Sequence, residues 1–400
     1  MSDKLTDAVK NDVKEAVARH HAAAIALSED LGDHPELSAE EFESSRKIVE
    51  LLRKGGYKVE YPYLGYETAF DAVLKNGDGP KVAIMVEYDA LPEIGHACGH
   101  NLHGALSVLA GLALTGLRDR FRGTVHVIGT PAEEADGAKI GMADKGIFDD
   151  MAVAMMMHSM GGGVSQPDMD ALSLRCYAVS FRGQTAHAAA APWEGRSALA
   201  AARKFLDLID ARRECFTPDI RVSGIVTDGG KATNIIPDHA EVQVEFRTSS
   251  MAGLKRLDET ILKCAKGAAL AMDCEVAWKQ TLSDFADMVR VQALEDEVER
   301  LFRERGMTVE PVTPPIGSTD VGNVSYRCPA IQPLIAITNE PYVLHTVEFA
   351  QATRRPEAHR AMASGAEVLT LLALRTLCDD AFRKEVQEGF VRSRDRKNGV

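Results

Sequence analysis

The densest group of chemically capable side chains lies between residues 83 and 104, where an apolar segment runs into a loop. Cys98 and His100 are separated only by Gly99, so a tight turn can point a thiolate and an imidazole at one centre, a donor pair that suits zinc. A single cysteine or histidine in a loop is usually structural, but four in eight positions after a strand indicate a metal site. The other donors of this stretch are Glu87, Asp89, His96 and His103.

Two further segments place donor side chains where predicted strands end. The β-branched run Gly123–Gly129 leads into a loop with Glu133 and Glu134, and the apolar run Ala152–Met157 ends at His158. Because sites in α/β sheets gather at the carboxyl ends of strands, these residues can reach the first loop. Of two adjacent carboxylates, one can bind metal while the other handles protons.

Hydrophobic periodicity predicts the elements that position these loops. Residues 4–31 have helical periodicity, and Ser38 with Glu41 makes a capping box for a second helix that ends near Leu52. Three strands and a buried helix follow, at Lys58–Tyr63, Thr68–Lys75, Lys81–Val86 and Leu102–Leu117.

The pattern changes near Asp170 and indicates a smaller inserted domain at residues 172–284. The order βαββαβ predicts two helices on one face of a four-stranded antiparallel sheet. Residues 1–171 and 285–400 then form the catalytic domain. The expected elements of the insert are Ser173–Phe181, Arg196–Glu214, Ile220–Thr227, Ala240–Arg247, Ala252–Ala271 and Cys274–Thr281.

After the insert, helical periodicity returns from Leu294. Pro329–Thr338 reads as a last buried strand, and a long Ala-rich helix from Arg360 to Leu377 closes the catalytic domain. Between them His345 lies in a loop, as a candidate fifth ligand that arrives from far along the chain.

Composition limits the partners. The net charge is 46 − 59 = −13 and the pI is about 5.5, which argues against nucleic-acid or anionic-membrane binding. Seven cysteines without regular spacing indicate reduced thiols in a cytoplasmic protein. The first residues have no signal-peptide pattern, and the longest nearly apolar run, Ala105–Leu117, is too short to span a bilayer.

Taken together, the motifs resemble the zinc-dependent amidohydrolases and aminoacylases of the M20 peptidase family, in the branch with a cysteine ligand (subfamily D). The resemblance covers nearly the whole chain and implies a zinc-peptidase-like domain with a central mixed sheet and a ferredoxin-like lid. Asn101 and Glu87 depart from the usual pattern of that branch and look like the aminobenzoyl-glutamate hydrolase and β-alanyl dipeptidase-like subgroup. The motifs are HACGHN, PAEE, the strand ending at His158, GQTAHA with APW, TNIIP, STDVGNVS and His345.

This resemblance implies two divalent metal ions per chain, with zinc favoured and manganese or cobalt as alternatives. Cys98 would bridge the two ions, Glu133 would be the catalytic base for a metal-activated water, and Asp89 would orient a ligand. The ligand set would be completed by His100, Glu134, His158 and His345.

The insert contributes residues to the substrate by the same resemblance. His187 would polarise the scissile carbonyl, often in the partner subunit's site, and Asn234 and Arg247 would hold a substrate carboxylate. Each of these three signals is weak without the resemblance. A homodimer through the lid is expected from the resemblance alone.

The predicted function is hydrolysis of N-acyl, N-aryl or aminoacyl amino acids, or of dipeptides, with a free carboxylate. A first alternative is a metal-independent hydrolase in which Cys98, activated by His100 or His158, is the nucleophile. A second alternative is a non-catalytic binding protein on the same scaffold. Chelation separates the first alternative from the metal-dependent reaction, and turnover excludes the second.

Overall fold

The computed structural model describes residues 6–398, which divide into two compact units, each with its own hydrophobic core. The larger unit combines the chain up to Asp170 with Met288–Pro315 and Thr319–Arg396. The second unit consists mainly of Ala171–Asp287, with Ile316–Ser318 and the chain from Lys397. Its main segment is therefore a few residues wider than the predicted insert.

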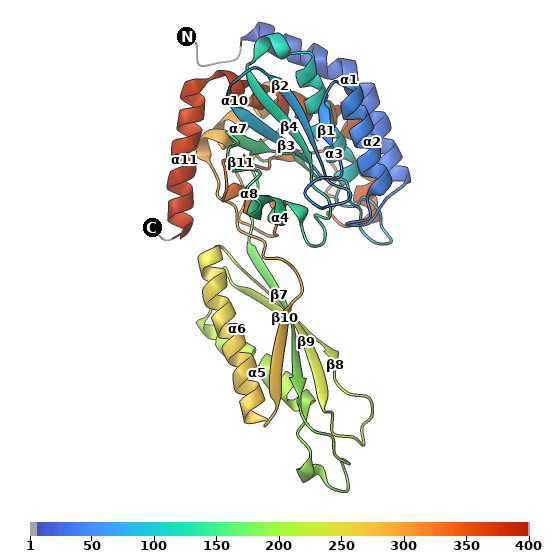
Figure 1. The fold of residues 1–400 in the computed structure, drawn as a ribbon, viewed down its shortest axis with the longest axis vertical. Helices are drawn as coiled ribbons and strands as arrows, with labels where there is room; N and C mark the ends of the chain where they lie inside the picture. Colours follow the sequence, from blue (N-terminus) through green and yellow to red (C-terminus); the bar gives the residue numbers. More distant parts are fainter. Residues whose placement is uncertain (1–5, 399–400) are drawn as a thin grey trace. The chain divides into compact units, whose positions relative to one another are not determined.

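The larger unit is built on a six-stranded mixed sheet, which confirms the predicted fold class (Figure 1). Strands β4, β3, β5 and β11 are parallel, whereas β1 and β2 are antiparallel to their neighbours. Val86 of β3 lies opposite Gly129 of β4, so these two strands end together and their loops share one edge. In sheet order the strands are β1 (Lys58–Glu60), β2 (Phe70–Asn76), β4 (Gly123–Gly129), β3 (Lys81–Val86), β5 (Val153–Met155) and β11 (Ala330–Ile331).

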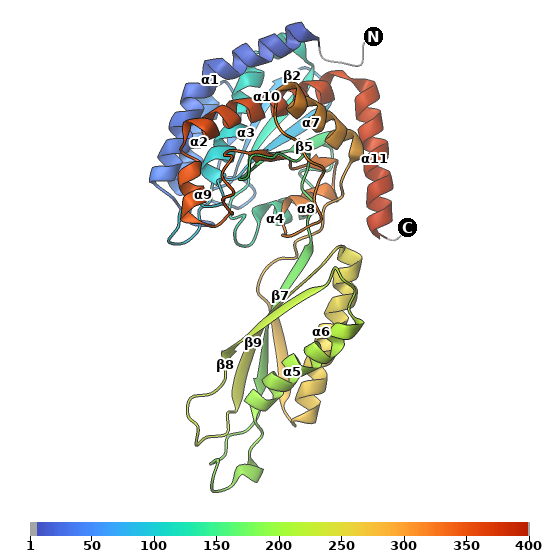
Figure 2. The same ribbon diagram turned by 180° about the vertical axis from the view of Figure 1, so that it is seen from behind.

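Three long helices form the main helical layer of this unit (Figure 2). Helices α1 (Asp7–Asp33), α3 (His100–Thr115) and α10 (Pro356–Cys378) pack on one another, and α3 and α10 also contact β3. Helix α10 is long and apolar enough to cross a membrane, but 67% of its most apolar window is buried in the core. The other helices are α2 (Phe42–Lys54), α4 (Ala138–Asp144), α7 (Gln292–Glu304), α8 (Val321–Ser325), α9 (Val347–Ala352) and α11 (Asp380–Asn398).

The second unit has the predicted βαββαβ order. Its antiparallel sheet runs β10-β7-β9-β8, and α5 and α6 cover one face of it (Figures 1 and 2). The two helices bury alanine and large apolar side chains against the sheet, including Phe205 and Ile261. The elements are β7 (Ser173–Arg182), α5 (Ala198–Arg212), β8 (Arg221–Asp228), β9 (His239–Thr248), α6 (Met251–Ala271) and β10 (Glu275–Gln280).

The predicted capping box at the start of α2 is wrong. Glu41 is the N-cap residue and makes no side-chain cap, and the Ser38 hydroxyl donates to Asp89 instead. Both Glu41 carboxylate oxygens are used elsewhere, since Oε1 accepts the backbone N–H of Ala132 and Oε2 accepts the Thr68 hydroxyl. These long-range acceptor roles outweigh the local pattern on which the prediction depended.

Two predicted strands are each divided. His158 does not end β5 but begins a separate strand, β6 (His158–Met160), which pairs with β12 (Leu334–Ala336). The expected strand Pro329–Thr338 therefore serves two sheets, through β11 and β12. The break falls at Gln332 and Pro333, because the Gln332 N–H is bound by the Asp168 carboxylate and proline has no N–H to donate.

Candidate metal centre

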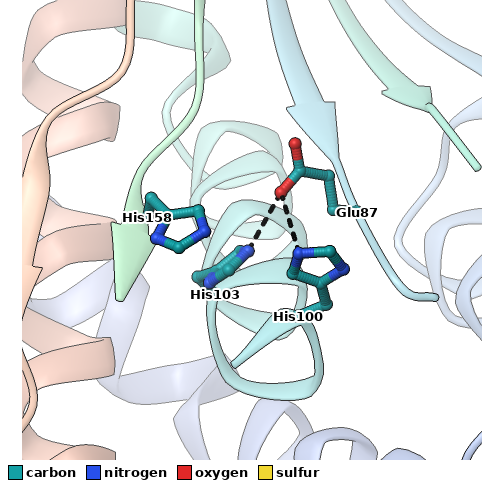
Figure 3. A group of neighbouring side chains, drawn as sticks. All are labelled: Glu87, His100, His103 and His158. Carbon is teal, nitrogen blue, oxygen red and sulfur yellow. Dashed lines mark hydrogen bonds and ion pairs between the residues drawn. The ribbon is translucent and has the colours of Figure 1, made fainter. Parts of the chain in front are cut away.

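The loops that leave β3 and β4, together with β6 and the start of α3, bring the candidate metal ligands together. The structure places Cys98, Glu134 and His345 in one group whose donor atoms lie within 4.8 Å of one another. His100 forms a second such group with Glu133 and Glu134. His158 belongs to a third, whose members are Glu87, His100, His103 and His158 (Figure 3).

The backbone at Gly99 makes the first of these groups possible. Gly99 has φ +90° and is the N-cap residue of α3, and a Cβ there would lie 3.0 Å from the Cβ of Ser159. This turn lets Cys98 precede the helix while His100 begins it. Farther along the chain, His345 also has a positive φ, of 64°, and its N–H donates to the Ala97 carbonyl at 2.8 Å. His345 is thus tied directly beside Cys98.

Asp89 fixes two of the candidate ligands. Its Oδ1 accepts from His100 Nδ1 at 2.9 Å, and its Oδ2 accepts the Glu134 N–H at 3.0 Å and the Ser38 hydroxyl at 2.7 Å. Burial alone raises the pKa of Asp89, but His100 and these hydrogen bonds lower it to about 2. Because the carboxylate is ionised, His100 Nδ1 carries the donated proton, which leaves Nε2 as a bare lone pair.

The bare atoms of this centre converge. Within residues 6–398, His100 Nε2 is buried without a hydrogen-bond partner, and so is Glu134 Oε1. Carboxylate oxygens of Glu87, Glu133 and Glu134 lie 3.7, 3.8 and 3.8 Å from His100 Nε2. Lone pairs that face one another in a buried site need a cation between them, so these residues fit a metal ion.

His158 is also presented as a neutral ligand. Its Nδ1 donates to the Ser159 carbonyl at 2.9 Å, so Nε2 is bare, and this atom lies 3.4 Å from Cys98 Sγ. Burial and the neighbouring His103 lower the pKa of His158 to about 3. The neutral imidazole is the form that binds metal.

The two adjacent glutamates have different surroundings. Glu134 approaches His345, with Oε1 at 3.5 Å from Nε2. Glu133 is 14% exposed, and burial with the carboxylates of Glu87 and Asp320 raises its pKa well above the usual range. A carboxylate with a raised pKa can take up and return a proton near neutral pH, as a general base requires.

In the second unit, His187 and Asn234 lie in neighbouring loops. The His187 ring accepts the N–H groups of Ala189 and Ala190 on Nδ1, at 3.2 and 3.1 Å, so its exposed Nε2 carries the proton. The Asn234 carbonyl accepts the Ala188 N–H at 2.9 Å, which joins the two loops. His187 therefore presents a hydrogen-bond donor from an exposed surface.

Arg247 is placed apart from these two residues. It lies near the end of β9, whereas Asn234 precedes the start of the same strand, so roughly 30 Å of strand separates them. Its Nε donates to Glu245 at 2.7 Å and its Nη1 donates to the Ser318 hydroxyl at 3.2 Å. The structure does not bring Arg247 and Asn234 together within one chain.

Comparison with known proteins assigns the chain to a family. Residues 173–273 match the description of a peptidase dimerisation domain of the M20 type. Over 384 residues the chain is 32% identical to a Xaa-Arg dipeptidase of Mus musculus, a match that covers 91% of this chain and 88% of that protein. The chain belongs to the M20 peptidase family. M20 enzymes with such names hydrolyse C–N bonds, and the chain is accordingly a C–N hydrolase.

Further M20 relatives and structures extend the match. The chain is 25% identical to a p-aminobenzoyl-glutamate hydrolase of Escherichia coli, with 94% of this chain and 93% of that protein covered. A putative aminohydrolase of Staphylococcus aureus has the same fold, with a TM-score of 0.79, 21% identity and 92% and 100% coverage. A structure described as a dinuclear metal binding peptidase from the M20 family of Bacillus subtilis matches with a TM-score of 0.69, 22% identity and 90% and 99% coverage.

Sequence reasoning missed three residues that support the centre of this M20 enzyme. Glu41 binds the N–H of Ala132, which has φ 60° and directly precedes Glu133. His103 and Lys139 both contact Glu87, at 3.1 and 2.6 Å. A lone lysine or glutamate on a short amphipathic helix has no local signature of burial, so only the tertiary contacts reveal it.

Proposed function

We propose that this M20 enzyme is a metal-dependent amidohydrolase that releases an amino acid with a free carboxylate from an acyl, aryl or aminoacyl group. The observation that carries the proposal is the convergence of bare, buried donor atoms on His100 and Glu134. Relatives named as a dipeptidase, an aminobenzoyl-glutamate hydrolase and an N-acetylcysteine deacetylase support this range of substrates.

The proposed cofactor is a pair of divalent ions, with zinc favoured and manganese or cobalt as alternatives. Cys98 would be shared between the ions. When bound, such ions supply Lewis acidity towards the attacking water and the amide oxygen. The donor set suits them because it combines a thiolate, imidazoles and a carboxylate, in Cys98, His100, Glu134, His158 and His345.

The chain's own residues divide the remaining work. Glu133 takes a proton from the attacking water and returns it to the leaving amine, so one carboxylate acts first as base and then as acid. The Nε2–H of His187 donates to the oxygen that becomes negative during attack. A guanidinium matches both oxygens of a carboxylate, so Arg247 with Asn234 is proposed to hold the substrate's carboxylate.

The spacing in the second unit supports a dimer. Because His187 and Asn234 lie at one end of β9 and Arg247 at the other, a small substrate can contact both ends only if two copies of the chain contribute. A homodimer through this unit, with each site completed by its partner, is therefore proposed. The proposed location is the cytoplasm, in keeping with seven free cysteines.

A substrate panel tests the proposal. Release of free amino acid is measured from N-acyl amino acids, aminobenzoyl-glutamate and dipeptides, including peptides that end in arginine, with metal-loaded protein and with Glu133→Ala. Turnover of one class that is lost in the variant and after chelation supports the proposal. A wild-type protein that binds no divalent metal would overturn it.

The cysteine-nucleophile alternative has one observation in its favour, the 3.4 Å contact between Cys98 Sγ and His158 Nε2. Against it, burial raises the pKa of the Cys98 thiol, whereas a nucleophilic cysteine needs a lowered one. Activity that survives chelation and is abolished by a thiol-alkylating reagent would establish this alternative. Activity lost on chelation and regained with added metal would exclude it.

A further inference from the structure

A fully buried lysine lies behind the candidate metal centre. Lys139, on α4, places its Nζ 2.6 Å from Glu87 Oε1 and 2.7 Å from Asp320 Oδ1, and none of the three side chains is exposed. Lysine is almost never fully buried unless it is paired, and removing one partner of a buried ion pair leaves a costly charge. The triad is therefore a built feature of this chain, and the chemistry proposed above does not use it.

The backbone around Lys139 is shaped for this contact. Asp320 Oδ2 accepts the Lys139 N–H at 3.2 Å, so one carboxylate binds both the main chain and the side chain of the lysine. Gly137 has φ +62°, and a Cβ there would lie 2.8 Å from the Cβ of Asp320. The start of α4 is thus held tightly against the residue that precedes α8.

Glu87 connects the lysine to the candidate ligands. Its second oxygen, Oε2, lies 3.1 Å from His103 Nε2 and 3.7 Å from His100 Nε2, and Figure 3 shows both rings directed at it. His103 Nδ1 accepts the backbone N–H of Ser159 at 3.2 Å, so its proton is on Nε2 and is donated to Glu87. Both nitrogens of His103 are occupied, and this imidazole is therefore a support and not a ligand.

The supported residues are the ligands themselves. Ser159, which His103 holds, directly follows His158, and His103 lies one helical turn after His100 on α3. The ring centroids of His103 and His158 are 4.5 Å apart. A displacement of Glu87 would therefore reach both ligand imidazoles.

The charges require a cation at this place. One oxygen from each of Glu87, Glu133 and Asp320 lies within 4.8 Å of the others, and like charges at this distance in a buried site repel strongly. The ammonium of Lys139 binds two of these carboxylates. The chain thus supplies one cation of its own beside the centre that is proposed to bind two metal ions.

We propose that Lys139 is a positioning residue of the hydrolase reaction: its ammonium holds Glu87 and Asp320 together, and Glu87, through His103, fixes the imidazoles of His100 and His158. The activity readout of this inference rests on the proposed function. Its geometric content, a charge-balanced support for two imidazoles, can be measured on the metal-free protein.

The test is a double-mutant cycle of Lys139→Met, Asp320→Asn and both together. Cobalt(II) affinity, the cobalt(II) absorption spectrum, kcat and KM are measured for each protein. Because loss of a residue that supports a metal ligand typically costs about 10–100-fold, Lys139→Met should lose about that factor in cobalt affinity and in kcat, with KM little changed. The double variant should regain most of the loss, since one positive and one negative charge are removed together.

The matched control is Lys145→Met, at the end of the same helix, because Lys145 is exposed and binds only the Leu64 carbonyl among the described residues. It should behave as wild type. Wild-type values in Lys139→Met, or a double variant as impaired as the sum of the single ones, would overturn the inference, since packing and not charge would then be the role of the lysine.

Two further measurements keep the outcome decisive. Nitrogen-15 histidine spectra of the metal-free protein should show His103 protonated on Nε2 in the wild type, with this signature perturbed in Lys139→Met and recovered in the double variant. If Lys139→Met fails to fold alone, folding of the double variant supports charge balance, and its failure overturns it. Wild type without cobalt binding but with the expected histidine spectra would refute the proposed function while leaving the support intact.

Discussion

The candidate metal centre of the larger unit and the polar loops of the second unit differ in how their side chains are held. His100, Asp89 and Glu87 are buried and bound to one another at the edge of a parallel sheet. His187 and Asn234 are exposed and are fixed mainly by backbone contacts of their own loops. The rigid centre can thus preset the bond-breaking chemistry, whereas the exposed loops can adapt to the substrate.

The sharpest expression of this difference is Glu133→Gln. The variant keeps the shape of the side chain but cannot accept a proton, so kcat should fall by about 10²–10⁴-fold with metal content unchanged. Metal analysis beside steady-state kinetics checks this. Glu134→Gln is the contrasting variant, because it removes a candidate ligand and should lose metal. Equal metal loss in both variants would remove the proposed division of roles between the two glutamates.

His187→Ala probes the other side of the comparison. Losing a donor to the developing oxyanion should lower kcat by about 10²–10³-fold, while metal affinity stays at the wild-type value. A change in metal affinity would contradict the separation of the two regions.

Mixed dimers sharpen the same point. If His187 acts in the partner's site, a dimer of one His187→Ala chain and one Glu133→Gln chain contains one intact site. Such mixtures should regain activity that neither variant has alone. If His187 acts within its own chain, mixing restores nothing, and the proposed exchange of residues between copies would be wrong.

Asp89→Asn should have a smaller effect on the rigid centre. The side-chain amide of this variant has only one acceptor atom, because its nitrogen is a donor, so it cannot accept from His100, Glu134 and Ser38 together. Metal affinity should fall by about 10–100-fold, measured by competition with a chelator. Asp119→Asn, at an exposed position, is the control. Unchanged affinity in Asp89→Asn would show that His100 is oriented by other contacts.

Sequence was most informative where a pattern is local. The strand Gly123–Gly129, the order of the second unit and the clustering of Cys98 with His100 depend on periodicity, turns and short spacings, and the structure shows each of them. The proximity of Glu134 to both followed from the rule that parallel strands share one carboxyl edge.

Long-range contacts explain what sequence could not predict. The capping box failed because Glu41 binds Ala132, 91 residues away, and Lys139 meets Asp320 from a distance of 181 residues. Neither partner leaves a mark on its neighbours in the chain. The separation of Arg247 from Asn234 was also hidden, because the motifs give residue types but not which end of a strand each occupies.

The smallest expected effect concerns stability, at Asp168 of the larger unit. Its Oδ1 accepts the N–H groups of Met169 and Gln332, both at 2.9 Å, and burial with the nearby Glu295 raises its pKa to about 8. The folded chain therefore holds a proton that the unfolded chain releases near pH 4. This contribution is fully present below about pH 4 and is lost as the pH rises towards 8.

Asp168→Asn cannot ionise and keeps an oxygen acceptor for both N–H groups. The variant should gain on wild type in free energy of unfolding between pH 5 and pH 8, by at most about 1.4 kcal/mol per pH unit. Denaturant titrations of the chelated proteins at several pH values measure this, with Asp119→Asn as an exposed control. Parallel pH profiles of Asp168→Asn and wild type would mean that Asp168 is already ionised in the fold. Its charge would then have to be balanced by its two N–H donors and by Arg290, which lowers the pKa of this carboxyl.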